Sequence, residues 1–296
     1  MPETRREGAK ARVAEIVREI AGVFAAAGLE ESRREAADLV AVMRDEARFW
    51  ASAHGEEMLD DREVARVRAA AERRASGAPF AYAAGRAAFR HLTLMVDERV
   101  LIPRSETEEL VQAVLDATAD RAGGTAIDLG TGSGAIALAL AQEGRFDQVI
   151  ATDMSTAALE VARLNLARCA PQLRAPVEFR AGGWLAPVAG VRARVVVSNP
   201  PYIAHDEAPA LPKSVRDWEP AVALFSADSG MRDLACIIRG APAVLEPGGL
   251  LALEIDSRRA SLAAELALAD GRYRNVAVRL DLAGRERILT AKRGES

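Results

Sequence analysis

The stretch Arg194-Val-Val-Val-Ser-Asn-Pro-Pro-Tyr-Ile-Ala204 decides the fold. Three consecutive valines predict a strand that is buried on both faces, as in a parallel sheet. The strand has to end at Asn199, because Pro200 and Pro201 lack the amide hydrogens that would continue a ladder. Its end therefore offers the Asn199 side chain, proline carbonyls and the ring of Tyr202, which suit a planar amino group such as an amide or a nucleobase. The structural alternative is a strand that simply ends in a Pro-Pro turn.

Strands and helices alternate after residue 125, which predicts a parallel sheet with crossover helices. The last two strand patterns, 273–280 and 285–291, are joined by a link too short for a crossover helix, so we expect an antiparallel pair at the sheet edge. The other strands are expected at 125–129, 148–152, 176–180, 193–198 and 249–255, and the helices at 134–143, 155–168, 230–244 and 258–268. The fold class is therefore α/β.

The first 75 residues carry helical patterns instead. Residues 9–28 place apolar side chains at three- and four-residue steps before Gly28, and 31–47 repeats this pattern. A third helix begins at Asp60, with Glu63 completing a capping box. We expect a small N-terminal helical domain over 1–75.

A linker over 76–108 and a sheet domain over 109–296 complete the expected organisation. Within the linker, 92–96 and 100–104 alternate between apolar and polar residues and predict a β-hairpin. Ser105 is the candidate N-cap of a helix that runs to about residue 118.

The amino-acid composition limits which kinds of binding partner the protein can be expected to have. The 296 residues include 39 basic and 43 acidic ones, a net charge of −4, so no basic excess favours direct binding of nucleic acid. Cys169 and Cys236 are isolated and only three histidines are present, so no metal site is expected. No apolar run approaches the roughly 20 residues of a membrane span, and the N-terminus does not resemble a signal peptide. We expect a cytoplasmic monomer without membrane contact.

A glycine turn follows the first strand of the sheet. In Asp128-Leu-Gly-Thr-Gly-Ser-Gly134, Gly130, Gly132 and Gly134 let the backbone turn tightly and approach a ligand, with Thr131 and Ser133 between them. The helix that follows directs its free amides at that ligand. Asp153 ends the next strand, 23 residues after Gly130, where a ribose-binding acid is expected.

This pattern also fits a dinucleotide site, but two features favour S-adenosylmethionine. Asp128 stands where a carboxylate can meet a cationic methionine moiety, whereas it would repel a pyrophosphate. The Asn199 strand end should also lie beside the first strand of a doubly wound sheet. The structural alternatives are a turn-capping role for Asp128 and a helix-capping role for Asp153.

Together these residues resemble the bacterial release factor glutamine methyltransferases (the PrmC/HemK family) over nearly the whole chain. Ile102-Pro-Arg-Ser-Glu-Thr-Glu108 is the most specific part of the resemblance, since unrelated methyltransferases with Asn-Pro-Pro-Tyr lack it. The other matching motifs are Pro79-Phe-Ala-Tyr-Ala-Ala-Gly85, the glycine turn, Ser198-Asn-Pro-Pro-Tyr-Ile203, Glu246-Pro-Gly-Gly249, Leu253-Glu-Ile255 and Asp281-Leu-Ala-Gly-Arg-Glu-Arg287.

The resemblance implies a Rossmann-like, seven-stranded S-adenosylmethionine-dependent methyltransferase domain and an N-terminal helical domain that helps to bind the release factor. It implies methylation of the glutamine amide in the Gly-Gly-Gln motif of release factors, in translation termination. By position, the residues of the cofactor site would be Asp128, Gly130, Thr131, Gly132, Ser133, Gly134, Asp153, Trp184 against the adenine, and Asn199. Asn199, Pro200, Pro201 and Tyr202 would bind the substrate glutamine, with Asn199, Pro200 and Tyr202 as the catalytic set.

Three positions depart from the family pattern: Ser105 replaces a proline, Gly183 replaces an acid before Trp184, and Asp256-Ser-Arg-Arg259 replaces a glycine and a glutamine. For the reaction, we expect the Asn199 oxygen and the Pro200 carbonyl to accept the two amide hydrogens while Tyr202 packs on the amide plane. The alternative function is a nucleic-acid methyltransferase that acts on an exocyclic base amine after base flipping. The acidic charge balance disfavours this alternative.

Overall fold

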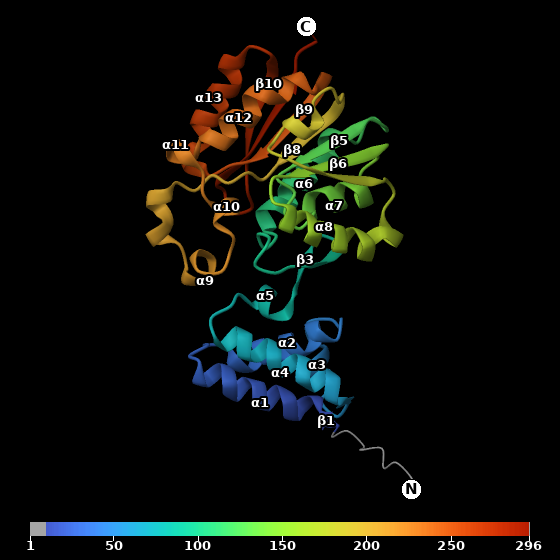
Figure 1. Ribbon diagram of the computed structural model, residues 1–296, viewed down its shortest axis with the longest axis vertical. Coiled ribbons are helices and arrows are strands. Elements are labelled where there is room, and N and C mark those ends of the chain that lie inside the picture. Colours follow the sequence, from blue (N-terminus) through green and yellow to red (C-terminus); the bar gives the residue numbers. More distant parts are fainter. Residues whose placement is uncertain (1–9, 296) are drawn as a thin grey trace. The chain divides into compact units, whose positions relative to one another are not determined.

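A computed structural model describes residues 10–295 of the chain, which forms two compact units that meet in sequence between Gly85 and Arg86 (Figure 1). Family resemblance and hydrophobic periodicity predict this combination of a small helical part and a large α/β part. None of the helices in the described part of the chain is long and apolar enough to cross a membrane.

The smaller unit is a helical bundle around its own apolar core. Ile16, Ile20 and Phe24 of the first helix are fully buried in this core, whereas Val23 of the same apolar pattern is 37% exposed. Its elements are β1 (Ala11–Arg12), α1 (Val13–Ala26), α2 (Ser32–Met43), α3 (Trp50–Ala53), β2 (Met58–Leu59), α4 (Asp61–Ala75) and α5 (Phe80–Ala84).

The predicted capping box at the start of α4 is present. The Asp60 carboxylate accepts hydrogen bonds from the backbone amides of Arg62 and Glu63, both at 2.8 Å, and Glu63 accepts one from the Asp60 amide at 2.8 Å. These bonds satisfy amides that have no partner within the helix, so the sequence signal fixes where α4 begins.

The larger unit is built on a seven-stranded sheet, and all seven strands predicted after residue 125 are present. The sheet has the order β10-β11-β9-β8-β5-β6-β7, and β11 runs opposite to its other six strands. Its strands are β5 (Thr125–Leu129), β6 (Gln148–Asp153), β7 (Val177–Ala181), β8 (Ala193–Ser198), β9 (Leu245–Glu254), β10 (Tyr273–Leu280) and β11 (Glu286–Arg293).

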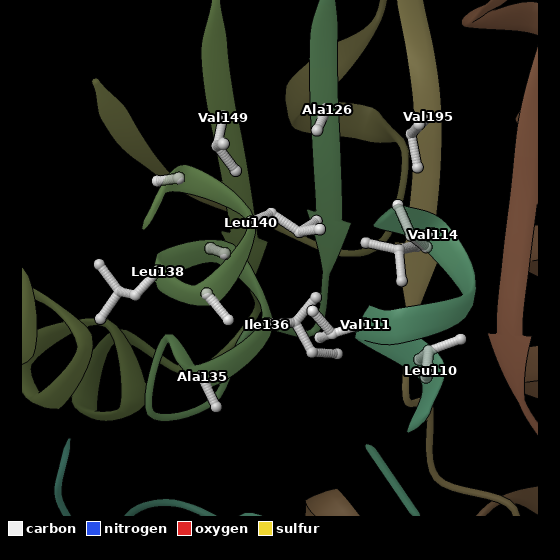
Figure 2. Packing of buried hydrophobic residues seen from close by; sticks show 14 of the residues in the cluster. Leu110, Val111, Val114, Ala126, Ala135, Ile136, Leu138, Leu140, Val149 and Val195 are labelled. Atoms are coloured by element: carbon white, nitrogen blue, oxygen red, sulfur yellow. The ribbon is translucent and has the colours of Figure 1, made fainter. Parts of the chain in front are cut away.

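Helices cover both faces of this sheet, which is why its central strands carry apolar runs such as Val195-Val-Val197 of β8. On one face, Ala126, Val149 and Val195 pack under two helices, α6 and α7 (Figure 2). On the other face, Ile127 and Val196 pack under α12 and α13. The helices are α6 (Ser105–Ala117), α7 (Ala135–Glu143), α8 (Thr156–Cys169), α9 (Lys213–Arg216), α10 (Ala221–Leu224), α11 (Ala227–Gly230), α12 (Arg232–Gly240) and α13 (Ala260–Asp270).

The β-hairpin lies earlier in the chain than predicted. It is formed by β3 (Arg86–Phe89) and β4 (Leu92–Met95), which pair antiparallel, whereas 100–104 contains no strand. The turn uses Arg90 at φ 51°, a conformation that is uncommon outside glycine, so no usual turn residue marks it. The apolar alternation at 100–104 reflects burial and not strand pairing, since Val100 is buried and Leu101 lines a cavity.

Ser105 is not the N-cap of α6. Arg104 occupies that position, and the Ser105 hydroxyl donates to the neighbouring Glu106 carboxylate at 2.9 Å. Helix α6 therefore begins one residue earlier than predicted, and without a side-chain cap. Acidic residues in its first turn, Glu106 and Glu108, still complement the helix dipole.

Leu140 on α7 is fully buried against the sheet (Figure 2). We expect Leu140→Ala to lower the free energy of unfolding by about 2–5 kcal/mol, because it leaves a cavity in a closely packed layer. The control is Leu262→Ala on α13, where the side chain is 53% exposed and the expected change is within about 0.5 kcal/mol. Urea unfolding followed by far-UV circular dichroism measures both, and equal losses would contradict the assigned core.

Candidate active site

A cavity lies in the larger unit where three neighbouring strands end. Strands β5, β6 and β8 run parallel and finish at Leu129, Asp153 and Ser198, and residues just after each of them line the cavity. The chain enters the sheet at β5 and proceeds in opposite directions on its two sides, so the cavity sits at the point where strand order reverses. Open α/β sheets place their ligands at this position.

The glycine turn after β5 forms one wall of the cavity. Gly130 has φ 72°, and a Cβ atom there would lie 3.3 Å from the ring of Trp184. Gly132 has φ 55° and its amide donates to the Asp153 carboxylate at 2.9 Å. Both positions therefore need glycine, one because an aromatic ring packs on it and both because the backbone is left-handed.

Asp153 is held at the end of β6 by backbone amides. Its Oδ1 accepts from the Ser155 amide at 2.8 Å and its Oδ2 from the Gly132 amide at 2.9 Å. Burial raises the pKa of this carboxyl, and the hydrogen bonds from Ser155 and Gly132 oppose that rise. A carboxylate has about four acceptor sites, so Asp153, which lines the cavity, can still accept hydrogen bonds from ligand hydroxyls.

Asp128 does not line the cavity, contrary to the predicted contact with a cationic ligand. It is fully buried beneath the turn, where its Oδ2 accepts from the Thr131 hydroxyl at 2.6 Å and from the Ala137 amide at 3.1 Å. Burial raises the pKa of the Asp128 carboxyl to about 7. The side chain therefore shapes the turn, which is the capping alternative, because it lies inside the strand–helix junction and not on its surface.

Trp184 lines the cavity beside Gly130 and is fixed by its own polar contacts. Its indole Nε1 donates to Asp233 at 3.2 Å, and the Ser226 hydroxyl donates to the same carboxylate at 2.5 Å. Gly183 before it also lines the cavity, and a Cβ atom there would meet no other atom within 4 Å. At position 183, where the family has an acidic side chain, this chain therefore has open space next to the Trp184 ring.

Asn199 lines the cavity directly after β8. Its Nδ2 donates to the Thr107 hydroxyl oxygen at 3.0 Å, and that hydroxyl donates to Glu254 at 2.6 Å. Pro201 also lines the cavity, whereas Pro200 is buried behind the wall.

Tyr202 is not among the cavity-lining residues. Its hydroxyl donates to Glu254 at 3.2 Å, and burial raises the pKa of the phenol above its ordinary value. The predicted packing of this ring on a substrate amide therefore stays a prediction.

The structure thus brings most of the predicted residues to one cavity and leaves some in the layer behind it. Those that line the cavity are Gly130, Thr131, Gly132, Ser133, Asp153, Trp184, Asn199 and Pro201. Asp128, Gly134, Pro200 and Tyr202 lie outside the lining.

Other lining residues were not singled out from the sequence. They include Arg99, Arg104, Thr107, Met154, Val222, Arg232 and Asp233. Arg104 and Thr107 belong to Ile102-Pro-Arg-Ser-Glu-Thr-Glu108, the most specific stretch of the family resemblance. That stretch could have marked them as candidate site residues. Arg104 forms an ion pair with the buried Glu219. Among residues 10–295, no group of histidine, cysteine and acidic side chains could hold a metal ion.

Asp256-Ser-Arg-Arg259, which differs from the family pattern, contacts the loops that follow Tyr202. Arg259 donates to the Ser229 carbonyl at 2.7 Å and to Glu207 at 3.0 Å. Gly230 packs so closely here that a Cβ atom would lie 2.1 Å from the Tyr202 carbonyl oxygen. The substituted residues therefore hold two loops together beside the end of β8.

Two family models match the chain. The model "Methyltransferase small domain" covers residues 106–212, and the model "PrmC N-terminal domain" covers residues 15–85. The solved methyltransferase from Pyrococcus furiosus has a TM-score of 0.52 over 70% of this chain and 91% of its own, at 20% identity, which shows the shared fold. The larger unit is therefore a Rossmann-like, S-adenosylmethionine-dependent methyltransferase domain.

Relatives in sequence extend over both units. The release factor glutamine methyltransferase of Moorella thermoacetica is 42% identical over 272 residues, covering 92% of this chain and 95% of the relative. That of Cereibacter sphaeroides is 40% identical over 283 residues, covering 95% and 98%. The chain belongs to the family of release factor glutamine methyltransferases.

Asp153 is the residue whose removal should affect cofactor binding most directly. We expect Asp153→Ala to weaken S-adenosylmethionine binding at least 10-fold, because it removes the cavity carboxylate and the acceptor for the Gly132 amide. Isothermal titration calorimetry measures this, with Glu265→Ala on the exposed face of α13 as the control.

The same ligand should raise the melting temperature of the wild type, while NAD should not, since only a ligand of the native state shifts unfolding. Stabilisation by NAD alone would contradict the cofactor assignment.

Proposed function

We propose that the chain transfers a methyl group from S-adenosylmethionine to the side-chain amide nitrogen of the glutamine in the Gly-Gly-Gln motif of peptide chain release factors. The observation that carries this proposal is the position of Asn199. Its side chain lies at the end of β8 in the same cavity as the glycine turn and Asp153. The acceptor proposed for the substrate amino group and the residues proposed to bind the cofactor nucleoside therefore line the same cavity.

The residues present fit the cofactor. Asp153 retains acceptor sites for ribose hydroxyls, Trp184 offers an aromatic wall beside Gly130, and the left-handed Gly132 leaves room for close approach. When bound, S-adenosylmethionine supplies an electrophilic methyl group. The protein's own residues bind S-adenosylmethionine and the substrate glutamine, and they orient the amide nitrogen of that glutamine.

Orientation matters because an amide nitrogen is a weak nucleophile, with its lone pair delocalised into the carbonyl. Asn199 Nδ2 is turned toward Thr107, so its Oδ1, on the opposite branch of the amide, is the acceptor available to a substrate N–H. We expect the Pro200 carbonyl to accept the second N–H. Fixing both hydrogens directs the nitrogen and supplies an orientation effect, and no base has to act before transfer.

The exocyclic amine of a nucleobase could be held by the same acceptors, and this is the alternative function. It is not favoured, because the relatives that cover nearly the whole chain bear the name of release factor glutamine methyltransferases. The net charge of −4 also gives no general attraction to a phosphate backbone.

We assign the smaller unit to recognition of the release factor. It has its own core, and all residues that line the cavity belong to the larger unit. A family model for this N-terminal domain matches residues 15–85.

The proposed substrate is tested by incubating the protein with methyl-labelled S-adenosylmethionine and either a release factor or duplex DNA. We expect label in the factor at its Gly-Gly-Gln glutamine, located by peptide mass spectrometry. Label in DNA alone would reverse the assignment.

Asn199→Ala should lower single-turnover methyl transfer to the factor by roughly 10²–10³, by analogy with the loss of one preorganised hydrogen-bonding group. S-adenosylmethionine affinity should hardly change, because the side chain faces the substrate. Asn199→Leu should be no better than alanine, since bulk cannot replace an acceptor. An alanine variant within a few-fold of wild type would rule out this role.

Deletion of the smaller unit, leaving 86–296, should keep S-adenosylmethionine affinity within a few-fold and sharply reduce methylation of the intact factor. The measurement pairs calorimetry with a labelling assay, and a short Gly-Gly-Gln peptide is the control substrate. Equal activity of the full and shortened proteins on the intact factor would show that the smaller unit has no role in recognition.

A further inference from the structure

A chain of three polar side chains runs from the cavity into the interior. Asn199 Nδ2 donates to Thr107 Oγ1 at 3.0 Å, and Thr107 Oγ1 donates to Glu254 Oε2 at 2.6 Å. The three residues come from the end of β8, the first turn of α6 and the end of β9. Thr107 is 4% exposed and Glu254 is 1% exposed, so water does not compete freely for these bonds.

The protons in this chain can be assigned from its chemistry. An ionised carboxylate only accepts hydrogen bonds, so Thr107 must use its single hydroxyl hydrogen on Glu254. The Thr107 oxygen then has only lone pairs to offer Asn199, and only the NH₂ branch of the amide can meet them. The reversed amide would place two acceptor oxygens against each other, with no hydrogen between them.

We propose that Thr107 and Glu254 are positioning residues that fix the rotamer of the Asn199 amide, so that its oxygen and not its nitrogen faces the substrate amino group. The proposal rests on the proposed function for the identity of that substrate. The orientation of Asn199 in the free protein can be measured without it.

Other groups around Glu254 bear on its charge. The Tyr202 hydroxyl donates to its Oε1 at 3.2 Å, and Arg287 on β11 stabilises its negative charge, whereas Glu106 on α6 opposes it. Arg287 is itself shared with Asp281 at 3.6 Å. Burial is the largest effect and raises the pKa of the Glu254 carboxyl to about 6.

Protonation of Glu254 would change which groups donate the hydrogen bonds between Glu254, Thr107 and Asn199. A protonated carboxyl can donate to Thr107, and the Thr107 hydroxyl hydrogen then becomes free to donate to Asn199. The amide can now turn its oxygen inward, which presents a donor to a substrate that also donates. Methyl transfer should therefore fall as pH decreases through about 6, as Glu254 becomes protonated.

The first test measures single-turnover methyl transfer to a release factor at saturating S-adenosylmethionine. We expect Thr107→Val, which keeps the shape and removes the hydroxyl with both of its hydrogen bonds, to lose at least about 10-fold at pH 8. Thr107→Ser should stay within about 2-fold of wild type. Cofactor affinity should be unchanged in both, and a valine variant as active as the serine variant would overturn the proposal.

The pH profile separates positioning from a merely structural role. In Glu254→Gln the side chain cannot ionise, so the decline in rate near pH 6 should disappear. The matched control is Glu106→Gln, which alters a neighbouring acid on α6 with no hydrogen bond to Thr107, and it should keep the decline. A decline that persists in Glu254→Gln would overturn the proposal.

The third measurement needs no substrate. In protein labelled with ¹⁵N-asparagine, the Asn199 side-chain amide hydrogen that is donated to Thr107 should exchange slowly at pH 8, quickly in Thr107→Val, and slowly again in Thr107→Ser. Rapid exchange in the wild type would overturn the orientation itself. If exchange behaves as expected while no factor is methylated, the proposed function fails and the orientation stands.

Discussion

Two consecutive prolines after Asn199 determine where the central strand β8 leaves the sheet. Neither proline has an amide hydrogen, so the ladders with β5 and β9 end at Ser198. Asn199 is consequently the first side chain beyond the sheet, at the same edge as the glycine turn after β5. The cavity and the polar chain behind it depend on that single break in backbone pairing.

Periodicity and turn chemistry in the sequence were enough to predict most of the fold. The seven strands after residue 125 and the four main helices between them follow from apolar runs that burial on both faces requires. The Asp60 capping box located the start of α4 because its two hydrogen bonds are local. Local interactions of this kind are legible in a sequence because the partners are only a few residues apart.

Where prediction failed, the deciding feature was not local. The hairpin was misplaced because its turn uses a left-handed Arg90 with no glycine or asparagine to mark it, while burial at 100–104 imitates strand alternation. Asp128 was assigned to the ligand because spacing alone cannot distinguish a carboxylate beneath a turn from one on its surface. The contact of Thr107 with Glu254 joins residues 147 apart in sequence, and only the folded sheet brings them together.

The buried Glu254 also connects catalysis with stability. Its folded-state pKa, about 6, lies above the ordinary value of 4.5, so the native state holds this proton more tightly than the unfolded chain does. The stability that the proton contributes is complete below pH 4.5 and is lost as pH rises through 6. The fold thus prefers the protonated carboxyl, whereas alignment of Asn199 requires the charged one. At neutral pH this family member carries a charge that weakens its own fold, a trade of stability for an active site held in one orientation.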